Sequence, residues 1–99
     1  MAKVYMIGTI TITNPEGYKP YAAEAPKTVA AAGGKYLVRG GAATLLEGKQ
    51  LGERHVVVEF PSRAAAEGWY NSSAYQAILP HRQNNSTGTL EFVEGYEPS

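Results

Sequence analysis

Three stretches of the sequence carry apolar residues at consecutive positions, where a strand with one solvated face would alternate apolar and polar residues. They are the segments 4–7 (VYMI), 36–38 (YLV) and 56–58 (VVV). Because consecutive strand residues point to opposite sides of a sheet, these strands have apolar side chains on both faces. Helices can cover one face, and the short chain has no further element for the other. The pattern predicts a homodimer that packs two sheets face to face; a lone domain with a partly exposed apolar face is the alternative.

The first part of the chain has the pattern of a strand followed by a helix. β-Branched residues favour a strand over residues 3–12. A helix capped by Asn14 is expected to begin at Pro15 and to continue, with an apolar stripe at helical spacing, until a pair of glycines ends it. Pro20 and Pro26 lie inside that helix, and each removes a backbone donor. We therefore expect a kink or a break near Pro26.

Glycine, serine and proline residues divide the rest of the chain into short elements. Gly40 and Gly41 are expected to turn one strand into a short partner strand. Ser62 can cap a helix, and Ser72 and Ser73 can start a further helical piece that a later proline weakens. The expected elements are strands at Lys35–Arg39, Ala43–Leu46, Arg54–Phe60 and Thr89–Val93 and helices from Ser62 to about Tyr70 and over Tyr75–Arg82.

The order of these elements, β-α-β-β-β-α-β, indicates an α+β fold. An antiparallel sheet with helices packed on one face, the ferredoxin-like arrangement, accommodates this order. Other arrangements of the same elements remain open. At 99 residues the chain is long enough for one domain, which we expect to span residues 1–99.

Composition and charge narrow the classes of function. Nine Lys and Arg residues balance nine Glu residues, so the chain lacks the basic excess on which nucleic-acid and anionic-membrane binding rest. Cys is absent, which excludes disulfides and cysteine nucleophiles, and Asp is absent, which excludes a Ser-His-Asp triad. The apolar runs are too short for a membrane helix, and no signal-peptide pattern is present. We expect a cytoplasmic protein with neither a nucleic-acid nor a membrane partner.

Strand alternation assigns the polar residues of two strands to one face of the sheet. With Val38 and Val58 taken as facing the helices, Arg39 and Glu59 fall on the other face, which a second subunit would enclose. Because an unpaired buried charge is costly, Arg39 and Glu59 are expected to pair. The pair is either a structural ion pair or a polar spot in an apolar pocket, where Arg39 orients a small anionic or carbonyl ligand.

Another group of polar residues flanks the junction between the last two helical pieces. Tyr70, Tyr75, His81 and Arg82 are amphipathic or ionisable, and they are candidates for lining a pocket mouth. The cation at Arg82 disfavours the charged form of His81, which would leave a neutral imidazole available as a base. Packing of Tyr75 on the sheet and a solvated helix end are the alternatives.

The sequence has no pattern typical of a metal or phosphate site. His55 and Glu59 are four residues apart on a predicted strand, a separation of roughly 13 Å, so they cannot share one ion. Two ordinary histidines are the expected interpretation of His55 and His81. The glycine pairs match no phosphate-binding loop. We expect no metal and no other cofactor.

Several segments together resemble one bacterial family. They are TNPEGYKPY, GGKYLVRGG, HVVVEFPS and WYNSSAYQ, with Arg82 before the last strand. In this order and spacing the chain resembles the domain of unknown function 1330 family, which looks like a branch of the dimeric α+β barrel superfamily. The positions that match the family pattern are Arg39, Gly40, Gly41, Glu59, Phe60, Pro61, Trp69, Tyr70, Tyr75 and Arg82.

The resemblance implies a ferredoxin-like subunit whose sheet packs against that of a twin. Relatives in the superfamily include cofactor-independent monooxygenases, lactone isomerases and haem-dependent enzymes, whose sites lie between sheet and helices. None of their catalytic residues maps onto this chain, so the resemblance transfers no activity. Pro20 is unusual for the family and leaves the regularity of the first helix open.

Two functions fit these features. In the first, a small homodimeric α+β barrel protein binds or transforms a small organic molecule, without a metal, in a pocket between sheet and helices. In the second, a non-catalytic dimer has a structural or ligand-sensing role. The sequence leaves open whether the chain is an enzyme and which ligand it takes. The pocket candidates are Arg39, Glu59, Tyr70, Tyr75, His81 and Arg82.

Overall fold

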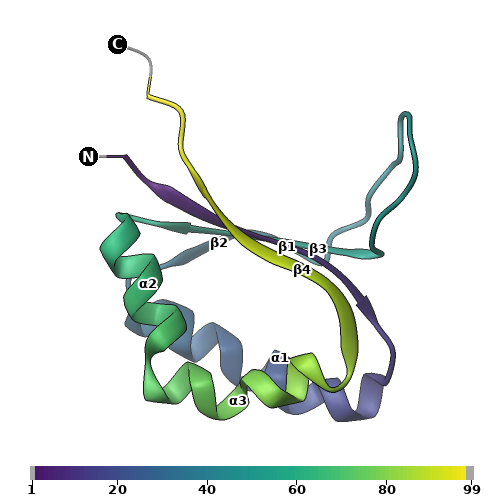
Figure 1. Ribbon diagram of the computed structural model, residues 1–99, viewed down its shortest axis with the longest axis horizontal. Helices are drawn as coiled ribbons and strands as arrows, with labels where there is room; N and C mark the ends of the chain where they lie inside the picture. The colour runs from purple at the N-terminus through teal and green to yellow at the C-terminus, as the bar shows by residue number, and fades with distance from the viewer. Residues whose placement is uncertain (1, 98–99) are drawn as a thin grey trace.

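The computed structural model describes residues 2–97, which form one antiparallel sheet of four strands and three helices (Figure 1). The strands lie in the order β2-β3-β1-β4, so β1 and β3 are central. This architecture confirms the predicted ferredoxin-like α+β class. In chain order the elements are β1 (Val4–Ile12), α1 (Pro15–Ala31), β2 (Lys35–Arg39), β3 (Arg54–Phe60), α2 (Arg63–Asn71), α3 (Ser73–Gln83) and β4 (Ser86–Glu94).

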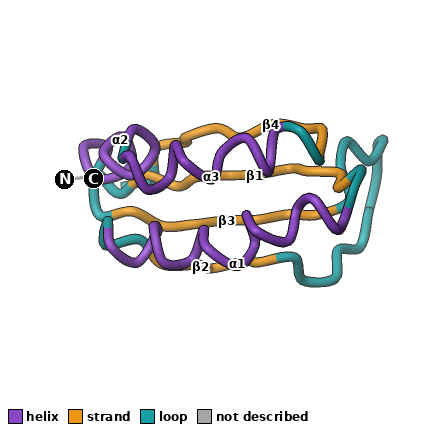
Figure 2. Tube along the Cα trace, turned by 90° about the horizontal axis from the view of Figure 1, so that it is seen from below, coloured by secondary structure: helices purple, strands orange, loops and turns teal. Residues whose placement is uncertain are grey.

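All three helices lie on one face of the sheet (Figure 1). Seen from the helical side, α1 runs along the β2 and β3 half, and α2 and α3 run along the β1 and β4 half (Figure 2). The core between the layers is apolar and aromatic, and Trp69, Tyr75 and Phe60 are its largest fully buried side chains. Ser62 and Ser72 cap α2 and α3 through their side-chain oxygens, as the sequence predicts.

The predicted short strand at Ala43–Leu46 is wrong. Residues 40–53 form a long loop that leaves the sheet on the side away from the helices (Figure 1). A partner for β2 would have to lie along its free edge, but at Gly40 the chain turns to the other side, where the Gly40 N–H donates to the carbonyl of His55 in β3. Leu45 and Leu46 are accordingly 57% and 89% exposed.

The break expected near Pro26 is also absent. Helix α1 continues through Pro20 and Pro26, and the Asn14 side chain makes no capping hydrogen bond. Because Pro26 has no N–H, the carbonyl of Ala22, four residues earlier, has no donor within the helix. Arg39 supplies one: its Nη2 donates to the Ala22 oxygen over 2.8 Å. The side chain of Arg39, on β2, thus gives the free carbonyl of α1 a hydrogen bond at the position where we expected the helix to break.

The outer face of the sheet has no helix over it. Ile7 and Val57 pair across β1 and β3, and Val38 pairs with Val57 from β2. Val38 and Val93 are 39% and 41% exposed. The second apolar face expected from the missing alternation is therefore present and uncovered. No helix in residues 2–97 is long and apolar enough to cross a membrane.

Candidate functional site

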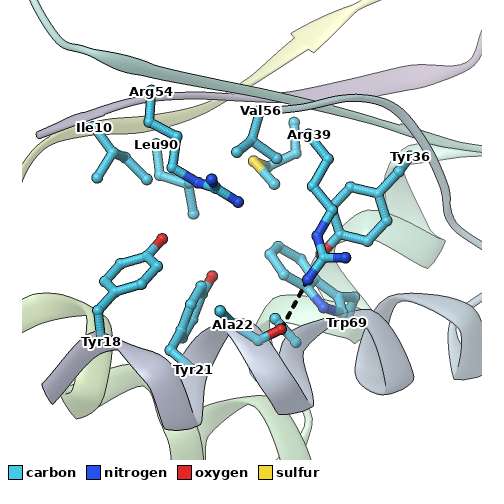
Figure 3. A pocket seen from close by; sticks show the side chains of 12 residues that line it. Ile10, Tyr18, Tyr21, Ala22, Tyr36, Arg39, Arg54, Val56, Trp69 and Leu90 are labelled. Carbon is cyan, nitrogen blue, oxygen red and sulfur yellow. Dashed lines mark hydrogen bonds between the residues drawn. The ribbon is translucent and has the colours of Figure 1, made fainter. Parts of the chain in front are cut away.

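A narrow cavity lies between the inner face of the sheet and α1 (Figure 3). The volume open to the centre of a water-sized group is about 20 Å³, enough for one such group. The whole space between the walls, including open solvent, is about 410 Å³. Apolar walls come from the sheet and from Trp69 of α2. The polar lining consists of Tyr18, Tyr21, Tyr36, Arg39 and Arg54.

Arg39 reaches this cavity because the pairing of β2 with β3 slips by one residue. Tyr36 pairs with Val58, but Val38 pairs with Val57 and Arg39 with Val56, so Leu37 has no partner. An extra residue in one strand reverses which face the following side chains occupy. The predicted position of Arg39 on the outer face is therefore wrong. Its guanidinium lies 5.4 Å from the centre of the Tyr36 ring and at the opening of the cavity (Figure 3).

Arg54, the first residue of β3, is the second cation of the cavity, and our sequence analysis did not select it. It shares its face with Val56 and Val58, and its side chain points into the cavity (Figure 3). Its Nε atom is buried and has no hydrogen-bond partner. The signal was present in the sequence, since the alternation that turns Val56 and Val58 toward the helices also turns Arg54 toward them.

The two arginines meet no acid in the cavity, since none of its lining residues is a Glu. Among the described residues, the ion pairs involve Lys3, Lys19, Lys27 and Arg63, all of them outside the cavity. Arg54 is half-buried and loses part of its hydration, Arg39 is exposed, and two like charges that line one cavity without a counter-ion repel each other. The cavity therefore has a positive electrostatic potential that favours an anion.

Two tyrosines of α1 form the opposite wall, with their hydroxyl groups directed toward the sheet (Figure 3). Burial raises the pKa of Tyr18, and the positive charge of the neighbouring Arg54 opposes that effect only in part. Burial also raises the pKa of Tyr21, and the hydrogen bond to Tyr75 adds to the increase. Both phenols consequently stay neutral at ordinary pH and are available as hydrogen-bond donors.

Tyr75 and Arg82 lie behind the residues that line the cavity; both contact Tyr21, and Tyr75 also packs on Trp69, with ring centres 4.2 Å apart. The hydroxyl oxygens of Tyr21 and Tyr75 are 2.8 Å apart and buried. The guanidinium of Arg82 lies over the Tyr21 ring, 5.8 Å from its centre, and beside Tyr75. Its Nε atom is buried without a partner. Two of the predicted pocket residues therefore stand in a second layer, one side chain away from the cavity.

Glu59 lies on the outer face of the sheet, as predicted, but it does not pair with Arg39. The hydroxyl of Tyr5 donates to Glu59 Oε1 over 3.1 Å, and Lys3 Nζ lies 3.5 Å from the same oxygen. The expected Arg39–Glu59 pair is therefore wrong, because the slip in β2 puts the two side chains on opposite faces. Glu59 is separated from the cavity by the sheet.

The remaining candidates are not among the residues that line the cavity. Tyr70 packs on Trp69 and Phe92, with ring centres 6.1 and 6.5 Å apart, and borders a shallow groove beside β4. His81 is exposed on the last turn of α3. Within residues 2–97, no three His or Glu side chains lie close enough together to hold a metal ion.

The fold and the cavity define a class of protein, a ferredoxin-like α+β subunit with a polar site between its sheet and its helices. Within this class, the chain belongs to the family described as domain of unknown function (DUF1330), whose model matches residues 3–96. The resemblance seen in the sequence is thereby confirmed. No curated protein matches the chain.

Solved structures share this fold at low sequence identity. A protein of unknown function from Rhodopseudomonas palustris is 20% identical with a TM-score of 0.76, covering 98% of this chain and 85% of that one. SnoaB, a cofactor-independent oxygenase from Streptomyces nogalater, is 11% identical with a TM-score of 0.62, covering 99% and 97%. A dimeric ferredoxin-like protein from an uncultured marine organism is 14% identical with a TM-score of 0.55, covering 100% of both chains. These matches establish the fold alone.

Proposed function

We propose that this protein is a homodimer that binds a small organic molecule in the cavity between its sheet and α1. The observation that carries the proposal is the cavity itself, which Arg39 and Arg54 line without an acid. Arg54 is half-buried with an unpartnered Nε atom and Arg39 is exposed, so a ligand that enters the cavity can supply the missing charge and hydrogen bonds.

The outer face of the sheet supports the homodimer. Tyr5, Ile7, Val57 and Val93 give this face an apolar centre that no helix covers. Of its charged residues, Glu59 already has Lys3 and Tyr5 as partners, while Glu91 and Lys35 lie toward the two edge strands, away from the apolar centre. A second copy covers such a face with an identical surface, as the two-fold symmetry of most homodimers requires.

Thermal unfolding with a panel of small molecules tests the binding function. The panel contains aromatic and aliphatic carboxylates, lactones, neutral phenols and haem, each at millimolar concentration where solubility allows. A ligand that binds only the folded state raises the melting temperature further as its concentration increases beyond the dissociation constant. At least one class is expected to raise it in this concentration-dependent way. No shift from any class, with tryptophan fluorescence also unchanged, would contradict the proposed function.

Sedimentation velocity tests the homodimer. Val57→Glu adds a charge at the centre of the outer face, whereas Ala23→Glu adds the same charge on the exposed side of α1. The wild-type chain and Ala23→Glu are expected to sediment as dimers at micromolar concentration, and Val57→Glu as a folded monomer or with at least tenfold weaker association. A well-folded wild-type monomer at that concentration would contradict the proposed dimer.

A further inference from the structure

We infer that the ligand of the cavity is a small organic monocarboxylate whose carboxylate group lies between Arg39 and Arg54. This inference rests on the proposed function, since it names the chemical class that the same cavity takes. The polar groups that line the cavity are guanidinium and phenol groups, and no acid is among them. Guanidinium groups donate hydrogen bonds and never accept them, so the complementary ligand group is an acceptor with negative charge.

The hydrogen bonds behind the cavity favour Tyr21 as a hydrogen-bond donor toward the cavity, like the two arginines. The hydroxyl oxygens of Tyr21 and Tyr75 are 2.8 Å apart, and either can be the donor. The guanidinium of Arg82, which lies over the Tyr21 ring and near Tyr75, can only donate, and this favours Tyr75 as the donor to Tyr21. In that arrangement the Tyr21 hydroxyl, which points toward the sheet, keeps its hydrogen for a ligand (Figure 3). Arg82 and Tyr75 act as positioning residues that make Tyr21 a third donor.

The dimensions of the cavity favour a carboxylate over a larger anion. With about 20 Å³ open to the centre of a water-sized group, the cavity admits one small polar group, and the rest of the ligand would extend into the solvent-open space beside Tyr36. A planar carboxylate matches the fork of a guanidinium and needs few donors. A phosphate would require more, and no Lys lines the cavity. The ring of Tyr36 and the indole of Trp69 offer apolar surface for a compact organic body.

Trp69, the only tryptophan of the chain, lines the cavity and so reports on its occupancy. The experiment titrates the full-length protein with benzoate, with the neutral isostere benzamide and with inorganic phosphate, and follows Trp69 fluorescence excited at about 295 nm, where tryptophan absorbs more than tyrosine. Melting temperature provides an independent readout. Benzoate is expected to bind in a saturable manner, and benzamide at least about tenfold more weakly, since each charged hydrogen bond lost costs about that factor. Phosphate is also expected to bind more weakly, because it needs more donors and has no apolar body to contact Tyr36 and Trp69.

Variants of the two arginines test which positive charges contact the carboxylate of benzoate. Arg54→Met and Arg39→Met are each expected to weaken benzoate binding about tenfold or more, whereas Arg54→Lys keeps the charge and loses less. Arg63→Met is the matched control, because Arg63 pairs with Glu67 on the surface of α2. Tyr75→Phe leaves the charges in place and is expected to weaken benzoate several-fold while benzamide binding stays unchanged. Circular dichroism confirms that each variant is folded.

The outcomes separate this inference from the proposed function. Preferential binding of benzoate that depends on Arg54 and Arg39 supports both. If benzamide or a neutral phenol binds as well as benzoate, or if Arg54→Met binds benzoate like the wild type, the carboxylate class is wrong and the binding function stands. If phosphate binds more tightly than benzoate, the ligand is an anion of another class. If none of these molecules, nor any in the wider panel, alters fluorescence or melting temperature, both are overturned.

Discussion

The guanidinium of Arg54 lies against the backbone of Gly40, in the space that a Cβ atom at position 40 would fill. Gly40 has a φ of 70°, a conformation that costs residues with a side chain about 1–2 kcal/mol. Its N–H donates to the carbonyl of His55 over 2.9 Å, which ties the end of β2 to the start of β3. The missing side chain at position 40 thus allows Arg54 to form one wall of the cavity.

Replacing this glycine is expected to damage both the turn and the cavity. Gly40→Ala should lower the free energy of unfolding by about 1–2 kcal/mol, because it forces an L-residue into the left-handed region. It should also weaken benzoate binding, because the new methyl group displaces Arg54. Gly41→Ala is the control, since a Cβ atom there meets nothing within 4 Å. Urea unfolding and benzoate titration check both effects, and equal behaviour of the two variants would contradict the contact with Arg54.

Removing the charge of Arg54 is expected to stabilise the free protein. The side chain carries a buried Nε atom without a partner and faces Arg39 across the cavity. Replacing an uncompensated partly buried charge by an apolar side chain of similar length commonly raises stability. Arg54→Met should therefore increase the free energy of unfolding by about 1 kcal/mol in urea, while Arg63→Met leaves it unchanged or slightly lower. A loss of stability in Arg54→Met would instead assign Arg54 a structural role.

The prolines of α1 provide a test of how Arg39 is held. Pro26→Ala restores an N–H that competes with Arg39 for the carbonyl of Ala22, whereas Pro20→Ala restores one far from Arg39. Both changes are expected to stabilise the helix by about 1 kcal/mol or more. Only Pro26→Ala should also weaken benzoate binding, by about two- to fivefold, because Arg39 is less firmly placed. Calorimetric titration measures this difference, and an equal affinity of the two variants would show that Pro26 does not position Arg39.

Alkaline pH is expected to destabilise the fold through its buried tyrosines. Burial raises the pKa values of Tyr18 and Tyr21 above the ordinary value of about 10. Above pH 10 the unfolded chain therefore binds fewer protons than the folded one, so stability falls as pH rises; below pH 10 these groups contribute no pH dependence. Urea midpoints between pH 8 and 11 measure the slope.

A matched pair of variants tests whether Tyr21 causes the loss of stability above pH 10. Tyr21→Phe should flatten the decline above pH 10, whereas Tyr96→Phe should not, because Tyr96 is 89% exposed. Absorbance at about 295 nm, which follows phenolate formation, should show Tyr21 ionising only as the protein unfolds. A Tyr21→Phe slope identical to that of the wild type would contradict the assignment.

Local patterns in the sequence predict most of the fold. Strong β-branched runs and serine caps define β1, β3 and the starts of α2 and α3 because these signals act within a few residues. The missing alternation correctly predicts an uncovered apolar face. The prediction for Ala43–Leu46 failed because its apolar residues resemble a strand, whereas the direction in which the chain leaves β2 depends on the contact of Gly40 with His55 of β3, which is distant in the sequence.

The cavity was harder to predict, for two different physical reasons. The slip at Leu37 leaves no trace in the sequence, because Tyr36, Leu37 and Val38 are all apolar and either register buries apolar groups. Arg39 was consequently placed on the wrong face. Arg54 is a different case. It lies two residues before Val56, so the same alternation that turns Val56 toward the helices turns Arg54 toward them, and the sequence alone could have identified it.

The central claim, that a carboxylate lies between Arg39 and Arg54, is tested most directly by the Nε–H resonances of the arginines in ¹⁵N-labelled protein. The chain has four arginines, and each signal is assigned by replacing that arginine with Met. During titration with benzoate, the signals of Arg39 and Arg54 should move in parallel and saturate, while that of surface-paired Arg63 stays fixed. Arg39 and Arg54 signals that remain in place, or that drift linearly together with Arg63, would contradict the account.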